Sequence, residues 1–355
     1  MISPYSPYME FAKTRQAGRY TLATSGIRNC PLSLLPVTLE ELSLDRPGGY
    51  GYGPLQEALA RHCSVTPDCV VAAGGTSMAN YLAIGAMVEP GDEVLVESPT
   101  YELILAVLRY LRLNVKQFQR RPEDGYRIDV EEVRRLVTPK TKLIILTNLH
   151  NPSSALVDEA TLRALGELGP HVLVDEVYLP ALFEATPLSA FHLGPQFIVT
   201  TSLTKVYGLS GIRCGWILAA PDLAWRMWRL NDLFGVVPPH PTEQMGVIAL
   251  ANLGPLAQRA RNILDANRPV LNAFLSSRRD LDSTPSEFGT ISFPRIKAGR
   301  VNEFCDMLRS KYETTVVQGE YFDCPDHIRI GIGGDPEMTA EGLKRLALAL
   351  DEWGH

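Results

Sequence analysis

The chain has 355 residues, of which 45% are hydrophobic and 21% are charged, a composition typical of a globular protein with a large core. The 40 acidic and 34 basic residues give a net charge of −6, which argues against nucleic acid as a partner because such proteins carry a basic surface. We find no signal peptide and no apolar run of membrane-spanning length. The six cysteines are scattered, without a CxxC pair, so we expect reduced thiols, no metal site and a cytoplasmic location.

Residues 69–220 alternate short apolar runs with amphipathic stretches. We expect strands at 69–75, 93–98, 114–120, 142–148, 171–177, 196–202 and 214–219, and helices at 76–87, 102–111, 129–137 and 158–168. This alternation is typical of an α/β fold with a mainly parallel sheet between helices. After about residue 220, long helical stretches at 222–234 and 241–280 lead into a smaller α+β unit that closes the chain.

Polar motifs follow four of these strands, where an open α/β sheet gathers its chemistry. "AAGGTS" (72–77) is a glycine loop that opens a helix and suits a phosphate. "NLHNPSS" (148–154) is a turn, and "VDEVY" (174–178) places Asp175 at the end of a buried strand, where a carboxylate needs a cation or a donor. "SLTKVYGLSGIRCGW" (202–216) surrounds Lys205 with side chains that bind anions.

A desolvated lysine is a nucleophilic amine of the kind that Schiff-base chemistry needs. Pyridoxal 5′-phosphate (PLP) matches all of these groups, because it carries a phosphate, an aldehyde, a phenolic oxygen and a ring nitrogen that a carboxylate can keep protonated. The chain has neither a GxGxxG nor a GxxxxGK[ST] motif, which argues against the alternative of a nucleotide-binding oxidoreductase.

The lysine segment resembles that of the class I/II aminotransferases, which are PLP-dependent enzymes of fold type I with the pattern S-x-x-K-x-x-G-x-x-G-x-R-x-G. "HNPSS", "DEVY" and "PGDEVLVESPTY" resemble three further motifs of that family, in the same order. The resemblance implies a large PLP-binding domain, a smaller α+β domain and transfer of an amino group from an amino acid to a 2-oxo acid. A lyase, decarboxylase or racemase of the same fold, and a PLP-binding regulator without turnover, are the alternatives.

The resemblance also implies roles for individual residues. Lys205 would form a Schiff base with PLP and move a proton during the reaction. Asp175 would keep the ring nitrogen protonated. Tyr178 and Asn151 would hydrogen-bond the phenolic oxygen, and Tyr101 would stack on the ring. The phosphate would be held by Gly75, Thr76, Ser202 and Arg213.

For the substrate, the resemblance implies that Arg329 binds the α-carboxylate, near Asn151, and that Gly26 lies in a segment lining the pocket. Family members build their sites at a dimer interface, so we expect a homodimer in which Tyr50 or Tyr52 reaches the partner's phosphate. The expected divisions are 1–45 for a segment lining the pocket and packing on the small domain, 46–240 for the large domain, and 241–355 for the interdomain helix and small domain.

The sequence departs from the family pattern at three positions: Ser154 replaces a glycine, Gln56 an arginine and Gln318 a proline. These departures concern substrate handling more than cofactor binding. The residues expected to influence side-chain specificity are Tyr5, Tyr8, Arg28, Asn29 and those at 234–243.

Overall fold

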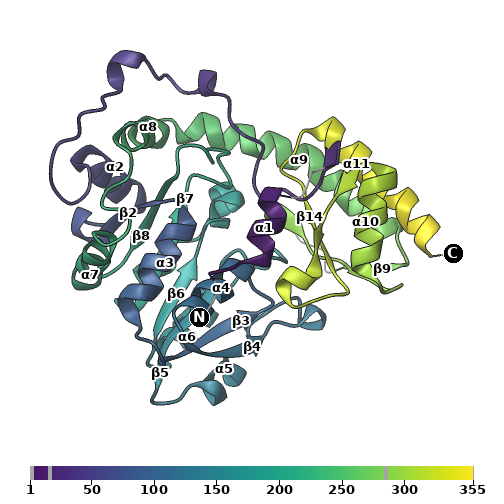
Figure 1. Ribbon diagram of the computed structural model, residues 1–355, viewed down its shortest axis with the longest axis horizontal. Helices are drawn as coiled ribbons and strands as arrows, with labels where there is room; N and C mark the ends of the chain where they lie inside the picture. Colours follow the sequence, from purple (N-terminus) through teal and green to yellow (C-terminus); the bar gives the residue numbers. More distant parts are fainter. Residues whose placement is uncertain (1–3, 15–17, 284–286, 355) are drawn as a thin grey trace.

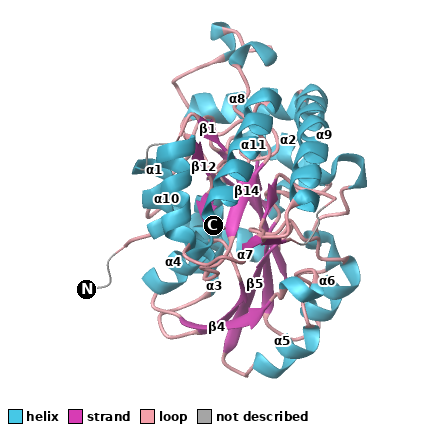
Figure 2. Cartoon of the chain, turned by 90° about the vertical axis from the view of Figure 1, so that its right-hand side faces the viewer, coloured by secondary structure: helices cyan, strands magenta, loops and turns pink. Residues whose placement is uncertain are grey.

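The computed structural model describes residues 4–14, 18–283 and 287–354. At its centre is a seven-stranded sheet of order β2-β8-β7-β6-β5-β3-β4, with helices on both sides (Figures 1 and 2). The strands are β2 (Val70–Gly74), β3 (Glu93–Ser98), β4 (Asn114–Gln119), β5 (Thr141–Thr147), β6 (His171–Asp175), β7 (Phe197–Ser202) and β8 (Cys214–Leu218). Neighbours run parallel except β8, which is antiparallel to β2 and β7. The prediction of an α/β fold with a mainly parallel sheet is confirmed.

The helices of this part follow from the sequence pattern. They are α2 (Gly53–Cys63), α3 (Thr76–Met87), α4 (Glu102–Tyr110), α5 (Val130–Leu136), α6 (Glu159–Gly166) and α7 (Pro221–Asn231). α3 packs against β2, β7 and β8, because small apolar residues such as Ala79 and Ala83 let it approach the sheet closely. Strands β5, β6 and β7 are buried over most of their length, as expected for central parallel strands covered on both faces.

The expected helical stretch at 241–280 is interrupted. The structure has α8 (His240–Ala251) and α9 (Leu253–Ser277), because Asn252 leaves the helical conformation and its side-chain amide donates back to the Ile248 carbonyl at 2.8 Å. The expected helix at 222–234 ends at Asn231. α9 runs from the large sheet to the C-terminal unit (Figure 1).

The C-terminal unit contains short strands and two long helices, α10 (Val301–Tyr312) and α11 (Pro336–Trp353). Its three-stranded sheet has the order β10 (Ile291–Ser292), β14 (Ile328–Gly331), β13 (Val317–Gln318). β9 (Leu281–Asp282) pairs with β11 (Arg295–Ile296). The N-terminal segment contributes α1 (Pro7–Thr14), beside α4, and β1 (Tyr20–Thr21), which pairs with β12 (Thr314–Thr315). The N-terminal segment therefore contacts both parts of the fold.

Short 3-10 helices lie in the connections: η1 (Leu32–Leu34), η2 (Leu39–Glu41), η3 (Pro67–Cys69), η4 (Pro122–Asp124), η5 (Leu179–Ala185), η6 (Ala190–Leu193) and η7 (Gly319–Phe322). Within the described residues, none of the helices combines the length and the apolar character that crossing a bilayer requires.

Candidate active site

The carboxyl ends of β5, β6 and β7 meet at one edge of the sheet because these strands are parallel. A cavity of about 180 Å³ opens there. It is lined by seven of the residues predicted from the sequence: Thr76, Tyr101, Asn151, Asp175, Tyr178, Lys205 and Arg213. A larger hollow of about 560 Å³ lies beside α1, but the lysine and the buried carboxylate line the smaller cavity.

One end of the cavity is built to hold an anion. Gly75 has a φ of +81°, and a Cβ added to it would lie 2.4 Å from Arg213 Nη2, so glycine is needed at the start of α3. The Thr76 hydroxyl donates to Ser202 Oγ at 2.8 Å. The buried Thr204 hydroxyl has no hydrogen-bond partner among the described residues. A guanidinium, hydroxyl groups and a helix N-terminus together suit a phosphate.

Asp175 is buried, with 4% of its surface exposed. Its carboxylate accepts from Asn80 Nδ2 at 2.8 Å and from the Val177 backbone N–H at 3.1 Å. Burial raises its pKa to about 6, while these two hydrogen bonds and the charge of Lys205 oppose the rise. Within the described residues Asp175 forms no ion pair, so its environment fits a cationic ring nitrogen.

Lys205 extends toward the same cavity from the segment that follows β7. Its Nζ donates to Ser25 Oγ at 3.0 Å and lies 6.0 Å from the centroid of the Tyr178 ring. Gly26 lies against the Lys205 backbone, where an added Cβ would be 3.0 Å from the lysine Cα. The structure therefore brings Gly26 beside the lysine, and a larger residue there would displace Lys205.

Arg329 comes from β14 and is buried, with 1% exposed. Its Nη1 donates to Asn151 Oδ1 at 3.1 Å, and its Nη2 donates to Tyr8 Oη at 2.9 Å and to the Ala23 carbonyl at 3.3 Å. Its Nε has no hydrogen-bond partner among the described residues. The guanidinium thus lies behind Asn151 in the cavity wall, and Arg329 is not itself among the described residues that line the cavity.

Tyr50 and Tyr52 do not line the cavity of their own chain. Tyr50 is 43% exposed and donates to Asp232 Oδ2 at 2.9 Å. The ring of Tyr52 packs edge-on against His240 at 4.7 Å. The expectation that one of them reaches a partner's site stays a prediction.

A family model described as aminotransferase class I and II matches residues 46–346. The chain belongs to this family. Arginine–pyruvate transaminase of Pseudomonas aeruginosa is 28% identical over 300 residues, which cover 81% of the chain and 76% of the relative. Capreomycidine synthase of Streptomyces vinaceus is 28% identical over 362 residues, which cover 97% and 93%. A crystal structure of a PLP-dependent aminotransferase from Streptococcus suis has a TM-score of 0.89 at 24% identity and covers 98% of this chain and 97% of that one.

The family and fold predicted from the sequence are thereby confirmed, and the chain is a PLP-dependent aminotransferase. Amino acids and 2-oxo acids are the substrates of such an enzyme. Three features of this chain fit PLP: the anion cradle at Gly75, the buried Asp175, which has no ion pair within the part of the chain that the structure describes, and Lys205 in the same cavity.

Sequence reasoning missed several residues of the aminotransferase site. Asn80 donates to Asp175, and its position four residues after Thr76 on the same helix face was a usable signal. Ser25, Met9 and Thr147 also reach the site, but no motif marks them.

The structure shows the surroundings of the three residues that depart from the family pattern. Ser154 adopts a left-handed φ of +65° and donates to the Ile291 carbonyl at 2.8 Å. Gln56 is buried and donates to the Val70 carbonyl at 2.8 Å, while Gln318 is buried in β13. Ser154 and Gln56 therefore contribute to packing and hydrogen bonding within the fold.

Proposed function

We propose that the aminotransferase uses Lys205, Asp175 and Arg329 to move an amino group between an α-amino acid and a 2-oxo acid. The observation that supports this assignment is a single cavity lined by both Lys205 and the buried Asp175, a carboxylate that forms no ion pair with any described residue. An anion site lies at one end of this cavity, and Arg329 donates to Asn151 in its wall.

Bound PLP supplies an aldehyde that takes up the amino group and a ring that withdraws electrons from the substrate's Cα. Asp175 holds a proton on the ring nitrogen, since an ion pair there compensates the buried carboxylate. Lys205 Nζ removes and returns the proton at the substrate's Cα. Tyr101 would pack against the ring, and Tyr178 and Asn151, which line the same cavity, would hydrogen-bond the phenolic oxygen.

The phosphate would be held by Gly75 and Thr76 at the start of α3, by Ser202 at the end of β7 and by Arg213 just before β8. The Thr76–Ser202 hydrogen bond of 2.8 Å aligns two of these hydroxyl groups before any ligand arrives. The Thr204 hydroxyl, which lacks a partner within the described residues, supplies a further donor.

Arg329 binds the substrate α-carboxylate. Its guanidinium lies over the rings of Tyr8 and Phe322, 5.4 and 5.1 Å from their centroids, which fixes its plane. Asn151 accepts from Nη1, so the Asn151 amide keeps its Nδ2 hydrogens for the cofactor. Arg329 thereby positions two groups at once: the substrate carboxylate that it binds and the Asn151 side chain that contacts the cofactor.

A homodimer completes the site in this proposal, with Tyr50 or Tyr52 reaching the partner's phosphate. Apolar side chains gather near Tyr50 on α7 and the loop that follows it: Trp225 is 50% exposed, Leu233 75% and Phe234 53%. The Trp225 ring is 4.8 Å from that of Tyr50. Light scattering should give twice the 39.2 kDa chain mass, and a monomer active at the same rate per chain would contradict the shared site.

We also propose a cytoplasmic location and retain the domain divisions at 45/46 and 240/241. All six cysteines are free thiols, which suits a reducing compartment. α8 begins at His240, next to the second division. Fractionation of the source cells would test the location.

Amino transfer is tested with a panel of ¹⁵N-labelled amino acids and either pyruvate or 2-oxoglutarate. We expect the label to appear in the new amino acid, and Lys205→Ala to abolish the transfer. The second candidate is a lyase, decarboxylase or racemase reaction, which would use the same cofactor-binding residues. One relative spanning 97% of the chain is named a synthase and not a transaminase, which favours keeping a second candidate. Label that never reaches the oxo acid, with elimination, CO₂ release or inversion instead, would establish the second candidate.

A further inference from the structure

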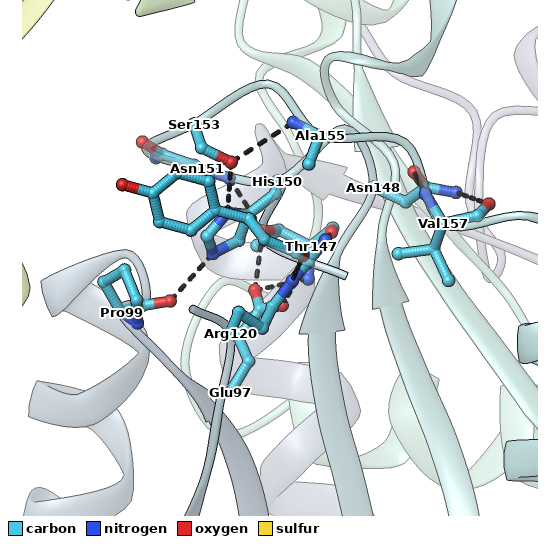
Figure 3. Close-up of polar contacts among 11 residues, drawn as sticks. Glu97, Pro99, Arg120, Thr147, Asn148, His150, Asn151, Ser153, Ala155 and Val157 are labelled. Carbon is cyan, nitrogen blue, oxygen red and sulfur yellow. Dashed lines mark hydrogen bonds and ion pairs between the residues drawn. The ribbon is translucent and has the colours of Figure 1, made fainter. Parts of the chain in front are cut away.

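A buried ion pair lies directly behind the loop that carries Asn151 (Figure 3). Glu97 is the penultimate residue of β3, and Arg120 follows β4. Both side chains have 0% exposure, and Arg120 Nη1 lies 2.7 Å from Glu97 Oε2. Arg120 Nε also donates to the Tyr126 carbonyl at 2.6 Å. Neither charge touches the cavity described above.

The second oxygen of Glu97 connects this pair to β5. Glu97 Oε1 accepts from the Thr147 backbone N–H at 2.7 Å and from the Thr147 hydroxyl at 2.6 Å. Because the hydroxyl has one hydrogen and donates it to Glu97, its lone pairs are left as acceptors. The Asn151 backbone N–H donates to the Thr147 hydroxyl oxygen at 2.9 Å. A continuous hydrogen-bonded chain thus leads from Arg120 to Asn151.

The same loop is braced at two other points (Figure 3). Asn148 joins the two ends of the loop. Its side-chain oxygen accepts from the Val157 N–H at 3.0 Å, and its Nδ2 donates to the Val157 carbonyl at 3.3 Å. His150 lies between the Pro99 carbonyl, 2.8 Å from Nε2, and Ser153 Oγ, 2.6 Å from Nδ1. Burial and the charge of Arg120 hold the pKa of His150 well below its usual range. The neutral ring therefore donates from Nε2 and accepts at Nδ1.

Stability alone does not account for this ion pair. Removing two charges from water is costly, and an apolar pair of similar volume is often as stable. A buried ion pair can instead serve to hold neighbouring groups in one fixed arrangement. We propose that Glu97 is a positioning residue, which through the Thr147 hydroxyl fixes the backbone of Asn151 and hence the side chain that faces Arg329 and the cofactor. The inference rests on the proposed function.

The test uses Thr147 because Glu97→Gln would leave the Arg120 charge buried without a counterion, which would confound folding with positioning. Thr147→Val removes the hydroxyl and keeps the shape, and Thr147→Ser restores the hydroxyl. The chain offers a matched control at the other end of the same two strands. There the Thr141 hydroxyl donates to Glu93 Oε1 of β3 at 2.5 Å, so Thr141→Val removes an equivalent bond far from the cavity.

We expect Thr147→Val to weaken PLP binding to the apoprotein about tenfold, the effect of losing one buried hydrogen bond, while Thr141→Val and Thr147→Ser stay within about twofold of wild type. The pH midpoint of the bound cofactor's visible absorption should rise in Thr147→Val, because a displaced Asn151 stabilises the deprotonated phenolic oxygen less. Urea unfolding of the two Val variants should show similar losses.

Equal PLP affinity and equal pH midpoints in the two Val variants would overturn this inference, as would a Thr147→Ser variant as impaired as Thr147→Val. PLP affinity is measured without any amino acid, so the result is separate from the proposed substrate roles. Normal PLP binding with no transfer of ¹⁵N by wild type would overturn the proposed function instead.

Discussion

Replacement of Asp175 by Asn should stabilise the apoprotein and weaken PLP binding at the same time. Burial raises the Asp175 pKa from 3.8 to about 6, so the folded chain binds this proton more tightly than the unfolded chain. The free energy of unfolding therefore falls as the pH rises from about 4 to about 6, and it stays low above that. The difference in pKa corresponds to about 3 kcal/mol.

The variant does not recover all of this energy. Asn80 donates to Asp175, and its own oxygen already accepts from the Thr200 hydroxyl at 2.5 Å. An amide NH₂ at position 175 would therefore face a donor, and the lost hydrogen bond costs about 1 kcal/mol. We expect the apoprotein of Asp175→Asn to gain about 1–2 kcal/mol at pH 7.5 over wild type. Urea unfolding between pH 4 and 8 measures this difference, which should grow between pH 4 and 6.

Glu176→Gln is the matched control. Glu176 is equally buried, with 5% exposed, and burial raises its pKa to about 7. Its Oε1 accepts from the Ala190 backbone N–H at 2.8 Å. The Glu176→Gln apoprotein should also be more stable than wild type, and this difference should grow between about pH 4.5 and about pH 7. Its PLP affinity should stay that of wild type. An Asp175→Asn apoprotein less stable than wild type at pH 7.5, or one that binds PLP as tightly, would refute the reasoning.

Three further predictions concern single residues. Borohydride should fix the cofactor on the wild-type peptide that contains Lys205, and Lys205→Ala should lose both label and turnover; label on another lysine would sink the assignment. Arg329→Lys should lower kcat/KM for amino acids by ten- to a hundredfold, about 1.5–3 kcal/mol, with the bound-cofactor spectrum unchanged; an equal loss for amines without a carboxylate would speak for a structural role. Ser154→Ala should cost about 1 kcal/mol in urea unfolding and Ser154→Gly less, because glycine tolerates the left-handed φ of +65°; the reverse order would contradict this.

The parts of the fold that sequence reasoning predicted are those set by local pattern. The expected bounds of β3 (Glu93–Ser98) and α3 (Thr76–Met87) coincide with the structure, since an apolar run and a glycine loop mark their ends. Parallel strands place their carboxyl ends at one edge, which brings Asp175 and Lys205 into one cavity.

Contacts between distant segments could not be predicted in this way. Tyr8 and Arg329 are 321 positions apart, and no sequence pattern in either segment indicates that the two side chains form a hydrogen bond. The break between α8 and α9 depends on one residue, Asn252, whose side chain bonds back to the preceding turn. The same sequence reads equally well as one long helix, because helical periodicity continues on both sides of the break.

The ion pair behind Asn151 shows most clearly why strand order matters. In sequence, Glu97 and Arg120 look like ordinary charged residues at strand ends, where solvent is the expected partner. In the sheet, β3 lies between β4 and β5, so the carboxylate of Glu97 meets Arg120 on one side and Thr147 on the other. If β4 were placed elsewhere in the sheet, the same residues would leave a charge unpaired in the core. The position of the Asn151 loop is thus a consequence of topology, which local sequence patterns do not determine.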